Sequence, residues 1–393
     1  MSNWEECSLK DVLGEKGYIR GPFGSSLKRG EMKESGIPVY EQKNAIYNSR
    51  EFRFYIDETK FKELERFQVN TNDLIISCSG TVGKISIINE NDPKGIISQA
   101  LLILRPDINK ITLKYLFYFL SSKLGFELLT QASHGSVQIN IAERKVVESI
   151  PLLLPPLPEQ KAIAVVLSSL DDKIDLLHRQ NKTLEALAET LFRQWFIEEA
   201  QDDWEEGVIP DEFDFTMGLS PPGNSYNEDC IGTPLFQGNA DFKFRFPENR
   251  VYTTDPKRFA EKHDTLISVR APVGAQNMAK GRCCIGRGVA AFRNKQNNLF
   301  YTYTYFKLKS LMNEIQQYNE TGTVFGSINK SDFQSFGISI PPTTLVERFQ
   351  NDVKPIDDKI ITNCFQIHTI EKLRDMLLPK LMSGEVRIKY KIN

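Results

Sequence analysis

Two stretches of the chain carry hydrophobic residues at alternating spacings of four and three, the heptad pattern of helices that pack along a shared seam. The seam positions of the first stretch are Ile163, Leu167, Leu170, Ile174, Leu177, Asn181, Leu184, Ala188, Leu191 and Trp195. A shift of 186 positions gives the second seam, which consists of Phe349, Val353, Ile356, Ile360, Asn363, Ile367, Ile370, Arg374, Leu377 and Leu381. The pattern predicts two long helices of the same periodicity.

Each predicted helix has one asparagine in its seam. A buried asparagine costs stability unless it finds a polar partner, so a matched pair fixes the register of two helices. Asn181 and Asn363 belong to opposite heptad classes, which favours an antiparallel pair with the two amides face to face. This register predicts two further contacts, Trp195 with Phe349 and Arg374 with Asp171. The alternative is that each helix packs on its own globular segment while both asparagines face solvent.

The segments before the two helices show shorter patterns. Apolar, β-rich runs bounded by Gly and Pro predict strands at 74–77, 85–88 and 97–104, and a helical pattern follows at 113–129. Proline-rich joints lead into both long helices. We therefore expect four parts, which are a mixed domain at 1–153, a helix at 154–205, a second mixed domain at 206–340 and a C-terminal helix at 341–393.

Short motifs recur in the same order in the two halves. The run DLIIS at 73–77 is matched by DTLIS at 264–268, and the turn sequences GTVG and APVG follow at the same distance. The run DDKI at 171–174 recurs at 357–360. Collinear matches of this kind indicate a duplicated unit. We expect an α+β fold in which two similar mixed α/β domains are separated by two long antiparallel coiled-coil helices, with a pseudo-two-fold internal repeat.

The composition is that of a globular protein with little overall charge. The 393 residues are 40% hydrophobic and carry 49 basic against 51 acidic side chains, a net charge of −2. Six cysteines without a C-x-x-C pair and four histidines argue against a zinc site or a disulfide framework, so a reducing cytoplasm is the expected setting. The N-terminal residues lack a signal-like apolar core, and we expect no membrane span.

Basic residues gather in Gly-rich stretches of both mixed domains. Arg and Lys can bind phosphates or guanine, and Gln and Asn can bind adenine, so these stretches are candidates for DNA contact. The candidates in the first domain are Arg20, Ser25, Lys28, Arg29, Gln42 and Lys43, and those in the second are Gln237, Asn239, Lys243, Arg245, Arg270 and Arg282. For each of them the alternative is a solvated loop, or a side chain that buttresses one.

The sequence carries no signal of catalysis. The run GTVGKI at 80–85 resembles a phosphate-binding loop, but Cys78 stands where such a loop needs glycine and Ile85 where it needs Ser or Thr, so a turn between strands is expected. Hydrolase and amino-methyltransferase motifs are missing, and the carboxylates are dispersed. We expect no enzyme activity, no catalytic residue and no metal site.

Four runs are specific in combination. They are DLIIS with the following GTVG at 73–83, LPPLPEQ at 154–160, TLFRQWF at 190–196 and LLPKLMSGE at 377–385. On these runs the chain resembles the DNA-specificity (S) subunits of type I restriction–modification systems over essentially its whole length. The resemblance implies that each mixed domain recognises one half of a split, asymmetric DNA target and that the two helices form the spacer.

The same resemblance implies partners for the chain. It would bind double-stranded DNA and dock two modification (methyltransferase) subunits, with restriction subunits added in the full complex. S-adenosylmethionine, ATP and Mg would then belong to those partners, and this chain would have no cofactor of its own. Because the net charge is near zero, we infer that the isolated chain binds DNA weakly. The alternative functions are a non-catalytic scaffold that spaces two partners without reading DNA and an enzyme with an unrecognised site.

Overall fold

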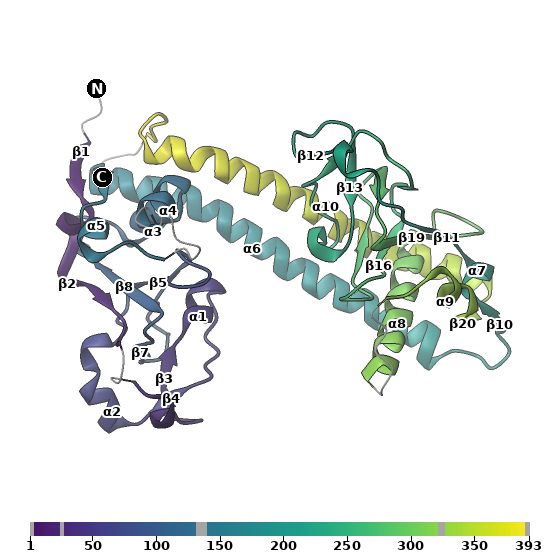
Figure 1. Ribbon diagram of the computed structural model, residues 1–393, viewed down its shortest axis with the longest axis horizontal. Coiled ribbons are helices and arrows are strands. Elements are labelled where there is room, and N and C mark those ends of the chain that lie inside the picture. Colours follow the sequence, from purple (N-terminus) through teal and green to yellow (C-terminus); the bar gives the residue numbers. More distant parts are fainter. Residues whose placement is uncertain (1–3, 24–26, 131–139, 321–326, 390–393) are drawn as a thin grey trace. The chain divides into compact units, whose positions relative to one another are not determined.

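The structure, a computed structural model, describes residues 4–23, 27–130, 140–320 and 327–389, with the backbone alone over 313–320. The chain divides into two compact units (Figure 1). The first unit consists of Met1–Lys173 and Ile370–Asn393, and the second consists of Ile174–Thr369. Each unit therefore contains one mixed domain and a part of both long helices.

The mixed domain of the first unit holds three small sheets. An antiparallel pair joins β1 (Glu5–Ser8) and β9 (Pro151–Leu154). An antiparallel sheet has the order β2 (Leu13–Arg20), β8 (Leu101–Pro106), β5 (Leu74–Ser77) and β6 (Ile85–Ile87). The third has the order β4 (Tyr55–Ile56), β3 (Ile37–Tyr40) and β7 (Ile96–Ile97), with β3 and β7 parallel. The helices are α1 (Gln42–Ile46), α2 (Glu58–Glu63), α3 (Leu113–Ser121), α4 (Lys123–Thr130) and α5 (Arg144–Glu148).

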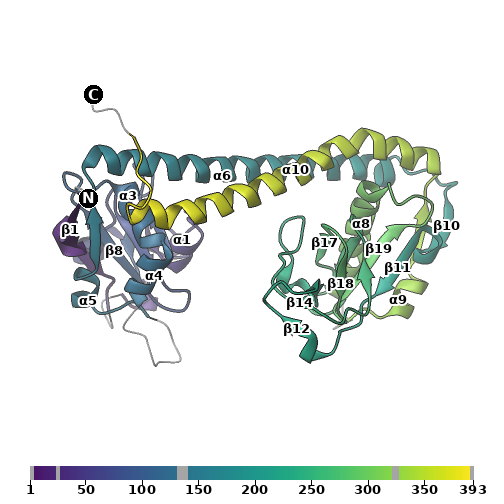
Figure 2. The same ribbon diagram turned by 90° about the horizontal axis from the view of Figure 1, so that it is seen from above.

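The second unit repeats the antiparallel pair and the four-stranded sheet, and it extends the three-stranded order β4-β3-β7 by one strand on each side. An antiparallel pair joins β10 (Glu205–Val208) and β20 (Gly337–Ile340). The antiparallel sheet has the order β11 (Phe213–Met217), β19 (Val289–Asn294), β16 (Thr265–Ser268) and β17 (Gln276–Met278). The remaining strands follow the order β12 (Tyr226–Asn227), β14 (Tyr252–Thr253), β13 (Thr233–Phe236), β18 (Cys283–Ile285) and β15 (Phe259–Ala260), with β13 and β18 parallel. The helices are α7 (Ile209–Glu212), α8 (Tyr301–Glu320) and α9 (Lys330–Ser335), and α8 packs on β16 and β19 (Figure 2). The predicted duplication is confirmed.

The recurring DLIIS motif forms the buried strands β5 and β16. The aspartate before each strand pairs with an arginine on the neighbouring strand: Arg105 Nε lies 2.7 Å from Asp73 Oδ1, and Arg293 Nη2 lies 2.5 Å from Asp264 Oδ2. Each aspartate also accepts a backbone N–H from the residue three positions earlier. A carboxylate at this position is therefore satisfied in the same way in both units, which explains why the motif recurs.

The GTVG run is the turn between β5 and β6, as predicted. The Gly83 N–H donates to the Ser77 carbonyl over 2.9 Å, and the Ser77 hydroxyl donates to the Thr81 carbonyl over 2.6 Å. Gly83 has a φ of +76°, and a Cβ atom there would lie 2.7 Å from the Phe126 ring. Backbone conformation and space both require glycine at this point.

Two predicted elements are divided in the structure. The strand predicted at 97–104 is two strands, β7 and β8, because the chain turns where the Leu101 N–H donates to the Ser98 carbonyl. The helix predicted at 113–129 is α3 and α4, because Ser122 has an extended backbone with ψ of 160°. The Ser122 hydroxyl accepts the Gly125 N–H and so begins the second helix. Hydrophobic periodicity continues across such a break and does not reveal it.

The long helices are α6 (Leu157–Arg193), which continues as a π-helical turn over Gln194–Glu198, and α10 (Thr343–Met382). In the second unit, Asn363 Nδ2 donates to Asn181 Oδ1 over 2.9 Å, and the rings of Trp195 and Phe349 lie 5.8 Å apart. Residue numbers rise along one helix as they fall along the other, so the pair is antiparallel, as predicted. Asn181 and Asn363 are only 1% and 0% exposed, which excludes the alternative of solvent-facing amides.

The same direction holds in the first unit. Arg374 Nη1 on α10 donates to Asp171 Oδ1 on α6 over 2.9 Å, the contact predicted from the register. Nearer the start of α6, Arg387 pairs through two hydrogen bonds with the buried Glu159, which also accepts the Trp4 indole N–H. Within the described ranges, no helix is long and apolar enough to cross a bilayer.

Candidate nucleic-acid interface

An open groove of about 1300 Å³ lies in the mixed domain of the first unit. It is lined by β2 and the residues after it, by the turn Glu65–Phe67, by Arg105 of β8 and by the segment that enters α5. The charged residues of the lining are Lys16, Arg20, Arg66, Arg105 and Arg144, against Glu65 and Glu143. This excess of basic side chains suits the binding of phosphate groups.

Three of these arginines lie against aromatic rings. The distances from guanidinium carbon to ring centroid are 5.9 Å for Arg20 and Phe23, 4.6 Å for Arg66 and Phe67, and 5.3 Å for Arg144 and Tyr18. Phe23 is 65% exposed, so one of the rings offers a free surface beside a cation. Cations interleaved with aromatic rings can contact both the backbone and the bases of a nucleic acid.

The basic residues of the groove are not equivalent. Arg105 makes two hydrogen bonds, of 2.7 and 2.8 Å, to the buried Asp73, and this contact raises the pKa of Arg105. Arg144 pairs with Glu148 over 2.7 Å but stays largely exposed. Arg105 therefore holds the sheet together, whereas the exposed Lys16 and Arg66 present their charge to the groove.

Of the first-domain candidates, the structure brings only Arg20 into this groove. Lys28 and Arg29 are exposed at the turn Arg29–Glu31, and Lys43 is half-buried on α1. The Gln42 amide donates to Ser79 Oγ over 2.8 Å, so this side chain buttresses the turn after β5. Ser25 lies outside the described residues. Contact with DNA stays a prediction for each of these residues.

The second-domain candidates gather around the connection between β13 and β14, at 237–251. Gln237 and Lys243 are exposed and Asn239 is half-buried, while Lys243 pairs with Glu248 over 3.2 Å. Outside the connection, Arg270 is exposed after β16. Arg282 is exposed too, and its guanidinium lies 4.1 Å from the Phe259 ring centroid.

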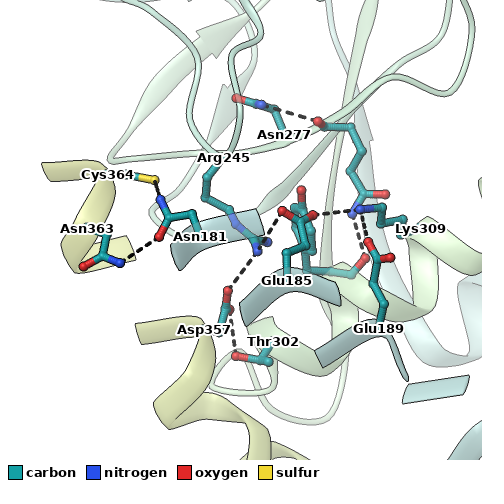
Figure 3. Close-up of polar contacts among 12 residues, drawn as sticks. Asn181, Glu185, Glu189, Arg245, Asn277, Thr302, Lys309, Asp357, Asn363 and Cys364 are labelled. Atoms are coloured by element: carbon teal, nitrogen blue, oxygen red, sulfur yellow. Dashed lines mark hydrogen bonds and ion pairs between the residues drawn. The ribbon is translucent and has the colours of Figure 1, made fainter. Parts of the chain in front are cut away.

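Arg245 requires a correction. Its side chain is 0% exposed and lies 3.3 Å from Asp357 Oδ1 and 4.0 Å from Glu185 Oε2 (Figure 3). The guanidinium also lies 3.9 Å from the Tyr305 ring centroid. A side chain buried among these groups cannot reach a DNA base, so the prediction of DNA contact for Arg245 is wrong.

Lys16, Arg66 and Arg144 were not among the DNA-contact residues predicted from the sequence. They come from three separate segments and meet only because β2, the turn Glu65–Phe67 and the start of α5 line one groove. The pairing of Arg66 with the adjacent Phe67 was the one local signal. Across the described part of the chain, no three His, Cys, Asp or Glu side chains are grouped so that they could hold a metal ion.

Comparison with known proteins gives a consistent result. The family described as the type I restriction modification DNA specificity domain matches residues 1–186 and 202–368. The MjaX type I restriction enzyme specificity subunit of Methanocaldococcus jannaschii is 32% identical over 412 residues, which cover 98% of this chain and 94% of that protein. The HindI specificity subunit of Haemophilus influenzae is 21% identical, with 98% of this chain and all of that protein covered.

A solved structure shares the fold. The S subunit of a type I restriction–modification system from M. genitalium matches with a TM-score of 0.60 at 18% identity, over 97% of this chain and 96% of that one. At this identity the match supports the fold alone.

Proposed function

Because this chain belongs to the family of type I restriction–modification DNA specificity proteins, we propose that it recognises a bipartite, asymmetric DNA target and directs modification and restriction subunits to that target. The duplication carries the proposal. The two mixed domains share the order of a four-stranded antiparallel sheet but differ in their exposed side chains, as two readers of different half-sites would. Sequence is read through side chains at base edges, so different side chains imply an asymmetric target.

The groove of the first unit supplies the DNA-facing surface in this proposal. Lys16 and Arg66 would bind phosphates, and Arg20 with the exposed Phe23 would approach the bases. In the second unit the corresponding role falls to the exposed residues of the connection 237–251, together with Arg270 and Arg282. The helices α6 and α10, each of which belongs partly to both units, would act as the spacer between the half-sites.

The partners and the chemistry are part of the same proposal. Two modification subunits would dock on the chain, and restriction subunits would join them in the full complex. Methylation with S-adenosylmethionine, and the ATP- and Mg-dependent steps, would take place on those subunits. The near-neutral net charge supports weak DNA binding by the chain alone, because phosphate contacts supply most non-specific affinity.

The competing function is a scaffold that spaces two partners without reading DNA. Footprinting of the complex with modification subunits separates the two. We expect two short protected blocks with an unprotected gap between them, on DNA that contains the methylated target but not on shuffled DNA. Protection that does not depend on sequence, or no protection at all, would favour the scaffold.

A further inference from the structure

The connection between β13 and β14 has one face in solvent and one residue inserted among the helices of the second unit. Its exposed residues include the DNA candidates Gln237 and Lys243, while the Arg245 side chain is fully buried. The next residue, Phe246, stacks on Phe365 of α10 with ring centroids 5.5 Å apart. The same short segment therefore carries candidate DNA contacts and an attachment to α10.

The Arg245 guanidinium is held by charges and a ring. Asp357 on α10 and Glu185 on α6 supply the carboxylates (Figure 3). Tyr305 on α8 supplies the ring. Its Nε, Nη1 and Nη2 atoms have no hydrogen-bond partner among the described residues. Burial raises the pKa of Asp357, and Arg245 is the largest of the influences that lower it. Removal of the arginine would leave Asp357 buried without its counter-charge, whereas Glu185 would keep Lys309, whose Nζ lies 2.7 Å from Glu185 Oε1.

Other bonds fix the connection in this place. The Arg245 carbonyl accepts the Met278 N–H over 2.9 Å, and the Asn277 amide donates to the Lys243 carbonyl over 2.6 Å. The backbone on both sides of Arg245 is thus tied to β17, while the side chain reaches α6 and α10. A shift of the domain against these helices would separate the guanidinium from Asp357.

In the first unit, the aspartate equivalent to Asp357 is neutralised by a cation from a different element. Asp171 is the counterpart of Asp357 in the repeated DDKI run, and its cation is Arg374 from the opposite helix. A shift of 186 positions from Arg374 leads to Ala188, which is buried and carries no charge. In the second unit the cation comes instead from the mixed domain. The connection between β3 and β4 in the first unit carries Arg50, whose salt bridge is with Asp92 inside its own domain.

We propose that Arg245 is a positioning residue. It fixes the position of the second unit's mixed domain against α6 and α10, and it thereby determines how the connection 237–251 faces DNA. The inference rests on the proposed function. It assigns to Arg245 an effect on one half of the DNA target although the side chain touches no DNA.

The test uses the complex with modification subunits and a DNA library mutated singly at each position of both half-sites. Arg245→Met alone leaves Asp357 without a counter-charge, so the main variant is Arg245→Met/Asp357→Asn. A single mismatch costs the wild-type complex about 5- to 150-fold in affinity. We expect the variant to lose this discrimination, to about threefold or less, at every position of one half-site and to keep it in the other.

Three controls interpret the result. Arg20→Ala, in the groove of the first unit, removes a proposed base contact, so it should lower discrimination in the opposite half-site and show which half each unit reads. Arg374→Met removes the corresponding helix-borne cation and should leave discrimination in the second unit's half-site unchanged. Phe246→Leu weakens the contact with Phe365 of α10 while all charges stay in place. It should therefore lower discrimination in the same half-site as the double variant. If the double variant does not fold, Phe246→Leu takes its place in the test.

Two outcomes would overturn the inference. Wild-type discrimination in a folded double variant would mean that Arg245 only stabilises the unit. A loss of discrimination confined to one base pair would mean that Arg245 contacts a base directly. Failure of the proposed function looks different, because the wild-type complex itself would then discriminate in neither half-site.

Discussion

The buried pair Asn181–Asn363 allows a sharp test of how the two helices are held together. The Asn363 amide donates to Asn181 Oδ1, and Asn181 Nδ2 donates to Cys364 Sγ over 3.5 Å, a weak bond. Asn363 Oδ1 has no partner among the described residues. The substitution Asn181→Leu removes the short hydrogen bond of the buried Asn363 amide and leaves it only the 3.5 Å contact with Gln180 Oε1.

The magnitude follows from this geometry. A buried polar group that loses its partner costs about 1–3 kcal/mol. Because the pair makes one short hydrogen bond of 2.9 Å, we expect Asn181→Leu to lower the free energy of unfolding of the second unit by about 1–2 kcal/mol. In the double variant Asn181→Leu/Asn363→Leu no amide is left unpaired, and stability should return to wild type or exceed it.

The assay must report on the second unit. The chain has three tryptophans, and Trp4 lies in the first unit whereas Trp195 and Trp204 lie in the second. In a Trp4→Phe background, fluorescence during urea denaturation therefore follows the second unit. Asn351→Leu, at an exposed position of α10, is the matched control and should change stability by no more than about 0.5 kcal/mol. A double variant that is less stable than the single one would refute the reasoning.

Three other outcomes are expected. Arg66→Ala should weaken binding of the complex to all DNA sequences and reduce the slope of log affinity against log salt concentration by about one. The control Lys123→Ala, exposed on α4, should change neither the affinity nor this slope. DNA titrations at several salt concentrations measure both quantities. Arg105→Met should lower the free energy of unfolding of the first unit by about 3 kcal/mol in a urea titration, because Asp73 then stays buried without its counter-charge, and an unchanged midpoint would contradict this. Burial lowers the pKa of His263 below its ordinary 6.5. As the pH falls, the histidine therefore takes up a proton in the unfolded chain before it does so in the folded one. The contribution of His263 to stability is complete above pH 6.5 and is lost as the pH falls through the lowered pKa. Asparagine does not titrate and tolerates the backbone φ of +72° at this position. Thermal melts of His263→Asn at pH 7.5 and 5.0 should therefore show a smaller loss of stability at acid pH than wild type, and equal losses would exclude His263 as the cause.

The elements that the sequence predicted well are those with a local periodic signal. The heptad positions, the paired asparagines and the repeated DLIIS run depend on spacing within one element or on similarity between two, and both are visible in the chain. The breaks at Ser98 and Ser122 could not be predicted in the same way. They depend on hydrogen bonds made where apolar residues continue on both sides.

The site shows why side-chain placement is harder to predict than fold. Lys243 and Arg245 alternate with phenylalanines, Arg250 follows in the same segment, and the three cations look equivalent in the sequence. Lys243 and Arg250 are exposed, whereas Arg245 is buried because Asp357 and Glu185, which are distant in the chain, lie opposite it. The groove of the first unit is likewise assembled from segments that are distant in the sequence, so no single motif marks it.

The division of the chain has a consequence for the order in which the protein folds on the ribosome. The second unit is one continuous stretch, but the first is completed only by residues from Ile370 onwards. Until Arg387 emerges, Glu159 lacks the counter-charge that holds it beside Trp4. The core of the first unit is therefore complete only after Leu381 and Met382 have been synthesised, later than every residue of the second unit.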